Sequence, residues 1–161
     1  MATYYQDFWA YGPDPDGDGK VGGLDNCPNI SNASQSNVDG DAAGDACDCA
    51  PSDPSAWGAA QIVSGLALSG ATTTSLSWND QSSAIGPGVR YDVATGDLLQ
   101  LHATGSYAPA TCVVDQTATP SATDGRTPGS GQGFYYLVRA RNACGLGSFG
   151  AGPLDTASPC P

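Results

Sequence analysis

The sequence predicts a mostly β protein, in which an irregular aspartate-rich loop segment precedes an antiparallel β-sandwich. Three observations lead to this fold class. Residues 13–50 have no helical periodicity and almost no apolar side chains, so they cannot bury a hydrophobic core. From Ile62 onward, short runs of alternating apolar and polar residues are separated by Gly, Pro, Ser and Thr. No stretch predicts a helix longer than one turn.

Composition divides the chain into four parts. Residues 1–12 are rich in aromatic side chains and predict a short strand, docked on this chain's own sandwich or added to another subunit. Residues 13–50 are the acidic segment, residues 51–60 a short linker, and residues 61–161 the sandwich with a C-terminal tail. Strands are expected within 64–70, 74–80, 89–95, 98–104, 110–117 and 133–145, with a long loop at 117–133.

Negative charge is concentrated at the front of the chain. The net charge is −11, and every acidic residue is Asp. Residues 1–56 carry ten Asp and one Lys, a net charge of −9, whereas residues 57–161 carry six Asp and four Arg, a net charge of −2. Such a front excludes nucleic acid and anionic membrane surfaces as partners and favours cations. No apolar stretch is long enough to span a membrane.

The aspartates of the acidic segment form an internal repeat. At an offset of 23, Asp14, Asp16, Asp18 and Asp25 align with Asn37, Asp39, Asp41 and Asp48. These are positions 1, 3, 5 and 12 of a twelve-residue loop, the spacing that offers Ca²⁺ hard oxygen ligands together with a backbone carbonyl at position 7. We therefore predict at least two bound Ca²⁺ ions. Their ligands would be Asp14, Asp16, Asp18, the carbonyl of Lys20 and Asp25, then Asn37, Asp39, Asp41, the carbonyl of Ala43, Asp45 and Asp48.

Two other metal sites explain the pattern less well. Mg²⁺ demands strict octahedral geometry and keeps its waters. A helix-flanked EF-hand fails because "NCPNISNASQ" after Asp25 contains Pro28 and several poor helix formers.

Six cysteines in so short a chain favour an oxidising compartment and up to three disulfides. Zinc is disfavoured because no Cys-x-x-Cys pair exists and His102 is the only histidine. The six residues are Cys27, Cys47, Cys49, Cys112, Cys144 and Cys160.

Residues 14–48, "DPDGDGKVGGLDNCPNISNASQSNVDGDAAGDACD", resemble a thrombospondin type 3 repeat. The resemblance implies a calcium-wrapped segment with little regular secondary structure and a disulfide between Cys27 and Cys47. It also makes Asn32 a structural residue rather than a glycosylation site. One departure is Ala42, which replaces a loop glycine where the turn often needs positive φ, at a cost of about 1 kcal/mol.

Residues 60–152 resemble, more loosely, a fibronectin type III domain, which implies an immunoglobulin/fibronectin-III-like antiparallel sandwich. Its core would contain Trp78, Tyr91, Tyr136, Val138, Ala140, Asn142 and Gly145. Arg90, Arg139 and Arg141 alternate with these apolar residues and are expected on solvated strand faces. Of the three ways to pair the other four cysteines, we favour Cys112–Cys144 with Cys49–Cys160; the alternative is Cys144–Cys160 with Cys49–Cys112.

The sequence contains no catalytic motif, so we expect no enzyme. It predicts a secreted, calcium-stabilised structural protein, extracellular or on a cell surface. One hypothesis is a self-assembling polymer subunit, a filament or adhesion element whose N-terminal strand adds to a neighbour. The alternative is a spacer and accessory binding module of a larger secreted enzyme or adhesin.

Overall fold

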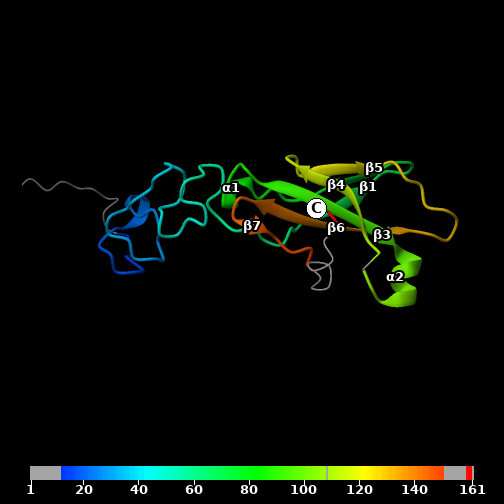
Figure 1. Ribbon diagram of the computed structural model, residues 1–161, viewed down its shortest axis with the longest axis horizontal. Helices are drawn as coiled ribbons and strands as arrows, with labels where there is room; N and C mark the ends of the chain where they lie inside the picture. Colours follow the sequence, from blue (N-terminus) through cyan, green and yellow to red (C-terminus); the bar gives the residue numbers. More distant parts are fainter. Residues whose placement is uncertain (1–11, 108, 151–158, 161) are drawn as a thin grey trace, which may run out of the picture.

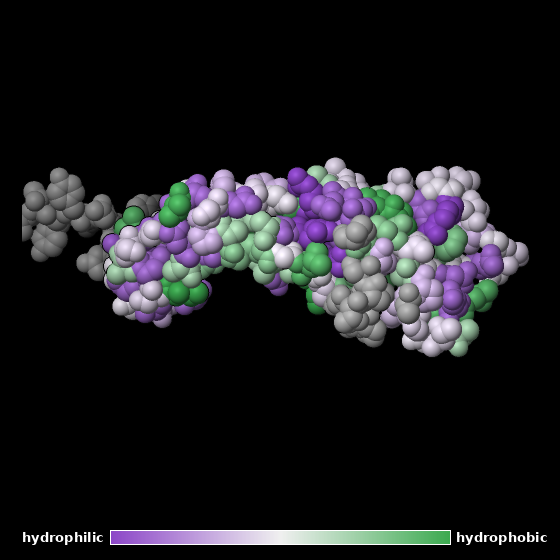
Figure 2. Space-filling view, viewed as in Figure 1, coloured by the Kyte–Doolittle hydropathy of each residue, from purple (hydrophilic) through white to green (hydrophobic). Residues whose placement is uncertain are grey.

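The computed structural model describes residues 12–107, 109–150 and 159–160. The strand predicted for residues 1–12 therefore lies outside the described residues, apart from Gly12. The acidic segment and the sandwich lie end to end in an elongated molecule (Figure 1). Figure 2 shows the acidic end as a narrower, mostly hydrophilic lobe. Within the described ranges, no helix is long and apolar enough to cross a bilayer.

Two antiparallel sheets form a β-sandwich, as the sequence predicts. One sheet has the strand order β1-β2-β5 and the other β4-β3-β6-β7. Strands β3 and β6 pair from Arg90↔Arg141 to Asp97↔Phe134 and form the centre of the larger sheet. The strands are β1 (Ala67–Ser69), β2 (Thr74–Ser77), β3 (Arg90–Asp97), β4 (Thr111–Thr117), β5 (Ser121–Asp124), β6 (Phe134–Asn142) and β7 (Gly145–Leu146); the helices are η1 (Gly22–Leu24), α1 (Ser82–Ile85) and α2 (Leu98–Thr104).

The hydrophobic core lies between the two sheets. Five of the seven residues that the sequence predicts for it are buried: Trp78, Tyr91, Tyr136, Val138 and Ala140. Asn142 is only partly buried and Gly145 is exposed, so the prediction is wrong for these two. The rings of Trp78 and Tyr91 meet edge to face, with 5.4 Å between their centroids. Alternation along β6 turns three of these side chains inward, which is why the strand pattern located the core correctly.

Residues 98–104 form helix α2, so the strand predicted there is wrong. The side chain of Asp97 accepts hydrogen bonds from the backbone N–H groups of Leu99 and Gln100 and caps the helix. Gly105, with φ of 64°, ends it in a left-handed conformation. The sequence signal was the Asp and Gly on either side of a run of good helix formers. The predicted loop 117–133 also contains a strand, β5, which pairs with β2.

The disulfides are Cys27–Cys47, Cys49–Cys144 and Cys112–Cys160, with Cα–Cα distances of 5.6, 5.5 and 4.9 Å. The favoured pairing of the last four cysteines and its alternative are both wrong. Cys112 on β4 and Leu137 on β6 both align with Ala94 of β3, which separates their strands. Cys144 lies seven residues beyond Leu137, so its Cα is too far from Cys112 for a disulfide.

Arg139 is buried, which contradicts its predicted place on a solvated face. Its side chain is only 1 % exposed, and its Nε lies 2.7 Å from Oδ2 of Asp92, which is fully buried. Arg139 also donates a hydrogen bond to the carbonyl of Cys160 (3.1 Å), and its guanidinium lies 4.8 Å from the centroid of the Phe149 ring. The disulfide to Cys112 brings Cys160 to this face of the larger sheet. Cys160, near the C-terminus, therefore covers the ion pair.

A second ion pair, between Asp124 and Arg126, makes the sandwich sensitive to acid. Arg126, together with Tyr136, donates hydrogen bonds to the Asp124 carboxylate and lowers its pKa from 3.8 to about 2. Because the folded-state pKa is the lower one, this stabilisation is present above about pH 4 and is lost as the pH falls towards 2.

We therefore expect Asp124→Asn to flatten the fall in the free energy of unfolding between about pH 4 and pH 2. Urea unfolding of the parent and of the variant at several pH values in this range measures the fall. An equally steep fall in the variant would contradict the assignment.

Candidate metal centre

The two loops of the 23-residue repeat fold with the same hydrogen bonds. In each loop, Oδ1 at positions 1, 3, 5 and 12 accepts a hydrogen bond from a backbone N–H two or three residues further on, which closes a tight turn. The matched N–H donors and acceptors are Gly17 to Asp14 and Gly40 to Asn37 (2.8 and 2.7 Å), Asp18 to Asp16 and Asp41 to Asp39 (both 3.2 Å), Lys20 to Asp18 and Ala43 to Asp41 (both 2.8 Å), and Cys27 to Asp25 and Ala50 to Asp48 (2.9 and 2.7 Å).

These turns leave the second carboxylate oxygen of most aspartates without a partner. Five Oδ2 atoms are buried and accept no hydrogen bond from any residue within the described ranges. They belong to Asp16 and Asp25 in the first loop and to Asp39, Asp41 and Asp48 in the second. A buried, unpaired carboxylate oxygen is costly, and in native proteins such an atom points to a missing ion or water.

The spacing of the oxygens fits a bound cation. One carboxylate oxygen from each of Asp14, Asp16 and Asp18 lies within 4.8 Å of the other two, and the same is true of Asp39, Asp41 and Asp48. Two ligands on opposite sides of a Ca²⁺ ion, each about 2.4 Å away, would be about 4.8 Å apart. The donor set is entirely hard oxygen, which suits Ca²⁺ and not the softer transition metals.

The carboxylates also repel one another. Burial raises the pKa of Asp16, and the negative charges of nearby aspartates add to the rise. Burial and the neighbouring carboxylates raise the pKa of Asp48 in the same way. A divalent cation among these groups would remove the repulsion and satisfy the unpaired oxygens together.

Asp45, predicted as a ligand, lies outside both carboxylate clusters. Its two oxygens accept hydrogen bonds from the Ser36 hydroxyl and the Val38 N–H, and the Ser36 contact lowers its pKa. Asp25 also lies outside the first cluster, although its Oδ2 is buried and unpaired. The carbonyls of Lys20 and Ala43 remain predicted ligands.

The two loops differ at position 5. Oδ2 of Asp18 accepts hydrogen bonds from the Asn32 N–H (2.9 Å) and from Nε2 of Gln35 (3.2 Å), whereas Oδ2 of Asp41 is unpaired. The strain predicted at Ala42 is absent, because the described non-glycine residues with positive φ are Gln35 and Gln116. The residue equivalent to Ala42 in the first loop is Gly19. It has a φ of 86°, and its backbone N–H donates a hydrogen bond to Oδ2 of Asp14.

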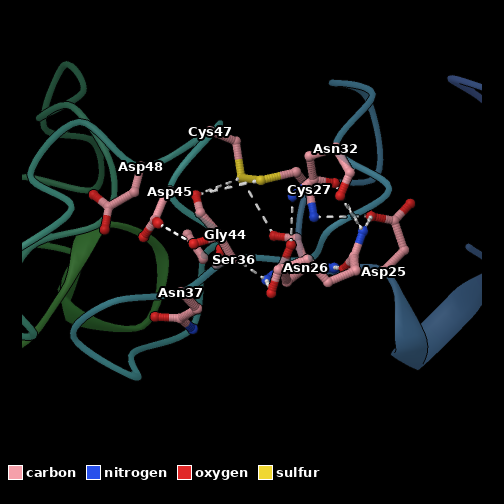
Figure 3. The surroundings of a disulfide bond; sticks show 12 residues. Asp25, Asn26, Cys27, Asn32, Ser36, Asn37, Gly44, Asp45, Cys47 and Asp48 are labelled. Atoms are coloured by element: carbon pink, nitrogen blue, oxygen red, sulfur yellow. Dashed lines mark hydrogen bonds between the residues drawn. A yellow bond between two sulfur atoms is a disulfide. The ribbon is translucent and has the colours of Figure 1, made fainter. Parts of the chain in front are cut away.

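A network of amide side chains joins the loops around the Cys27–Cys47 disulfide (Figure 3). Oε1 of Gln35 accepts from the backbone N–H of Asn26 (2.7 Å), and its Nε2 donates to Oδ1 of Asn32 (2.8 Å). Asn32 in turn donates to Oδ1 of Asn26 (2.7 Å). Asn32 is therefore part of the scaffold, in line with the structural role that the resemblance implies.

The predicted linker, residues 51–60, is packed against the sandwich. The carbonyl of Ser55 accepts from Gly88, and that of Ile85 accepts from Trp57 and from the Asn142 side chain. Gly86, with φ of 111°, permits the contact, because a Cβ there would lie 2.2 Å from the Ser55 carbonyl oxygen. With Cys49–Cys144, these contacts attach the acidic segment to the end of the sandwich.

Comparisons with known proteins show a likeness in structure but none in sequence family. No family model and no curated protein matches the chain. A solved Fn3-like protein from Clostridium thermocellum is similar in structure, with 23 % sequence identity and a TM-score of 0.39. The match covers 56 % of this chain and 88 % of that one. The likeness of residues 14–48 to a thrombospondin type 3 repeat stays a prediction.

Proposed function

We propose that the chain is a secreted, calcium-stabilised structural module whose residues 13–50 form a thrombospondin type 3-like calcium repeat. The observation that carries the proposal is the set of five buried, unpaired carboxylate oxygens in two loops of matching geometry. Bound Ca²⁺ would take the place of the hydrophobic core that this segment lacks, as metals do in other small modules.

Three disulfides support the extracellular or cell-surface location, because disulfides persist in oxidising compartments. In this proposal the calcium is structural rather than catalytic. Nothing in the carboxylate loops resembles an activated nucleophile or a general base, and the chain would not be an enzyme in its own right.

The packed junction favours a rigid spacer as one form of this function. A spacer must hold its ends at a fixed separation. A flexible linker between the acidic segment and the sandwich would let that separation vary. Here the segment 51–60 is hydrogen-bonded to the sandwich and Cys49 is bonded to Cys144. Such a module would suit a larger secreted enzyme or adhesin.

Self-assembly is the other form, and it depends on the aromatic residues 1–11. A strand added to the edge of a neighbouring sandwich would propagate head to tail into a polymer. We expect a calcium-loaded chain that assembles to lose assembly when residues 1–11 are deleted, while calcium binding stays unchanged.

Light scattering of the full and truncated chains, with Ca²⁺ and with chelator, separates the two forms. A particle mass that rises with protein concentration in the full chain, but not in the truncated chain, supports strand addition. A monomer under every condition supports the spacer, and equal assembly of the truncated chain would contradict strand addition.

A further inference from the structure

A polar hollow of about 310 Å³ lies where the packed segment meets the sandwich. Asp53 and Ser55 line it from the segment, and the remaining walls come from the sandwich. The sandwich residues that matter here are Arg90, Gln116, Arg141 and Asn142. None of the residues that line the hollow is a predicted calcium ligand.

Two arginines lie side by side in the wall of this hollow. Arg90 on β3 and Arg141 on β6 are direct cross-strand partners, an arrangement that places like charges side by side and destabilises a sheet. The chain has only five Lys and Arg residues in all. Two of the other arginines are paired with aspartates, Arg126 with Asp124 and Arg139 with Asp92. Arg141 also lies within ion-pair distance of Asp92, whereas no ion pair to Arg90 is found among the described residues.

The contacts of these arginines are compatible with a ligand. Arg90 donates one hydrogen bond to the neighbouring Val89 carbonyl (2.7 Å), and a guanidinium carries five N–H donors. Nη1 of Arg141 lies 3.8 Å from Oδ2 of Asp92, the oxygen that Arg139 already approaches to 2.7 Å. Paired guanidinium groups match the planar fork of a carboxylate.

Gln116 holds an unusual conformation at the same hollow. Its φ is 53°, in the left-handed region that non-glycine residues rarely occupy, and its N–H donates to Oδ1 of Asp92 (3.0 Å). Gln116 lies in a β-bulge, where β4 has one residue more than β3 between the pairs Tyr91↔Thr117 and Val93↔Val114, and bulges are enriched next to functional sites, where they redirect a side chain.

We propose that the hollow binds the carboxylate of a hydroxyl-rich acid, a sugar acid such as a uronate. Two arginines and Asp53 give the lining a net charge of +1, which matches a singly charged carboxylate better than a doubly charged phosphate or sulfate. Of the other polar lining groups, the Ser55 hydroxyl and the Gln116 amide suit sugar hydroxyls rather than an apolar side chain, whereas the Asn142 amide is held by Gly58, Ile85 and Cys144. This inference goes beyond the proposed calcium function and does not depend on it.

The test is a titration of the calcium-loaded chain with glucuronate at constant ionic strength, followed by amide NMR shifts of Gly88 and Gln116. Saturable shifts are expected with glucuronate, weaker ones with acetate, and none with glucose, which lacks the carboxylate. Absence of saturable shifts with glucuronate would overturn the proposal, and so would equal binding of glucose. Tighter binding of sulfate or of an aspartate-rich peptide would overturn the assignment to a sugar acid.

Two substitutions with opposite expected effects make the test specific. Arg90→Gln removes one guanidinium and should weaken glucuronate binding at least about tenfold, the loss of one charge-assisted contact. Asp53→Asn keeps the oxygen that accepts from Ser55 but removes the competing charge, so binding should become tighter. Asp97→Asn, a change of the same charge at the opposite end of β3 from Arg90 that keeps a side chain able to cap α2, is the control and should leave the affinity near that of the parent. Weaker binding in Asp53→Asn would contradict the site even if Arg90→Gln failed to fold.

Discussion

Removing Ca²⁺ from the folded chain should loosen residues 13–50 and leave the sandwich folded. The sandwich has its own core around Trp78 and Tyr91, whereas the acidic segment has mutually repelling carboxylates and few buried apolar side chains. At a free Ca²⁺ concentration 100 times the Kd, one ion would contribute about 2.7 kcal/mol to the stability of the part that binds it.

Limited proteolysis at aspartates, with Ca²⁺ and with chelator, measures this effect. We expect cleavage within residues 13–48 to accelerate at least about tenfold in chelator, while cleavage within residues 67–146 stays slow. The Cys27–Cys47 disulfide should hold the cleaved pieces together until it is reduced. Equal protection of the acidic segment in both conditions would show that calcium does not stabilise it.

Arg139→Met should destabilise the sandwich by about 3–5 kcal/mol, the usual effect of removing one partner from a buried ion pair. The substitution leaves the Asp92 carboxylate fully buried beside the Gln116 N–H, with the Arg141 guanidinium 3.8 Å away. The double variant Asp92→Leu/Arg139→Met removes both charges and should recover much of the loss.

Urea unfolding of the parent, the single variant and the double variant provides the measurement. Arg90→Met is the matched control, because Arg90 is on the neighbouring strand, is only partly buried and makes no ion pair with any residue that the structure describes. Its expected effect is within about 0.5 kcal/mol. A loss below about 1 kcal/mol in Arg139→Met would mean that the buried pair is not needed for stability.

The sequence was most informative where a feature depends on residues close together in the chain. Alternation along β6 located Tyr136, Val138 and Ala140 in the core, and the offset of 23 located two loops whose turn-closing hydrogen bonds to Oδ1 match. Both follow from local geometry: side chains alternate along a strand, and aspartate closes short turns through its own backbone.

The features that could not be predicted depend on contacts between distant residues. The pairing of Cys49 with Cys144 follows from where the segment 51–60 packs, and the burial of Arg139 follows from the position of Cys160. Neither contact has a sequence signal. Helix α2 is different, because the sequence contained both of its end signals, the Asp97 cap and Gly105 at the C-terminus. In the fold these signals prevail over the strand-like spacing of apolar residues in 98–104.

Position 5 of the two loops offers the sharpest comparison of predicted ligands. Asp18 and Asp41 occupy equivalent places, but only Asp41 has an unpaired Oδ2, since that of Asp18 is held by Asn32 and Gln35. A substitution at Asp41 should therefore act mainly on calcium affinity, whereas one at Asp18 should also weaken the metal-free scaffold.

Isothermal titration of the chelator-treated chain with Ca²⁺ tests the central claim most directly. The expected result is saturable binding of at least two ions per chain, with binding to one site weakened at least about tenfold by Asp41→Asn and unchanged by the control Asp115→Asn. Absence of saturable binding, or equal calcium affinity in Asp41→Asn and the parent chain, would contradict the assignment of these loops to calcium.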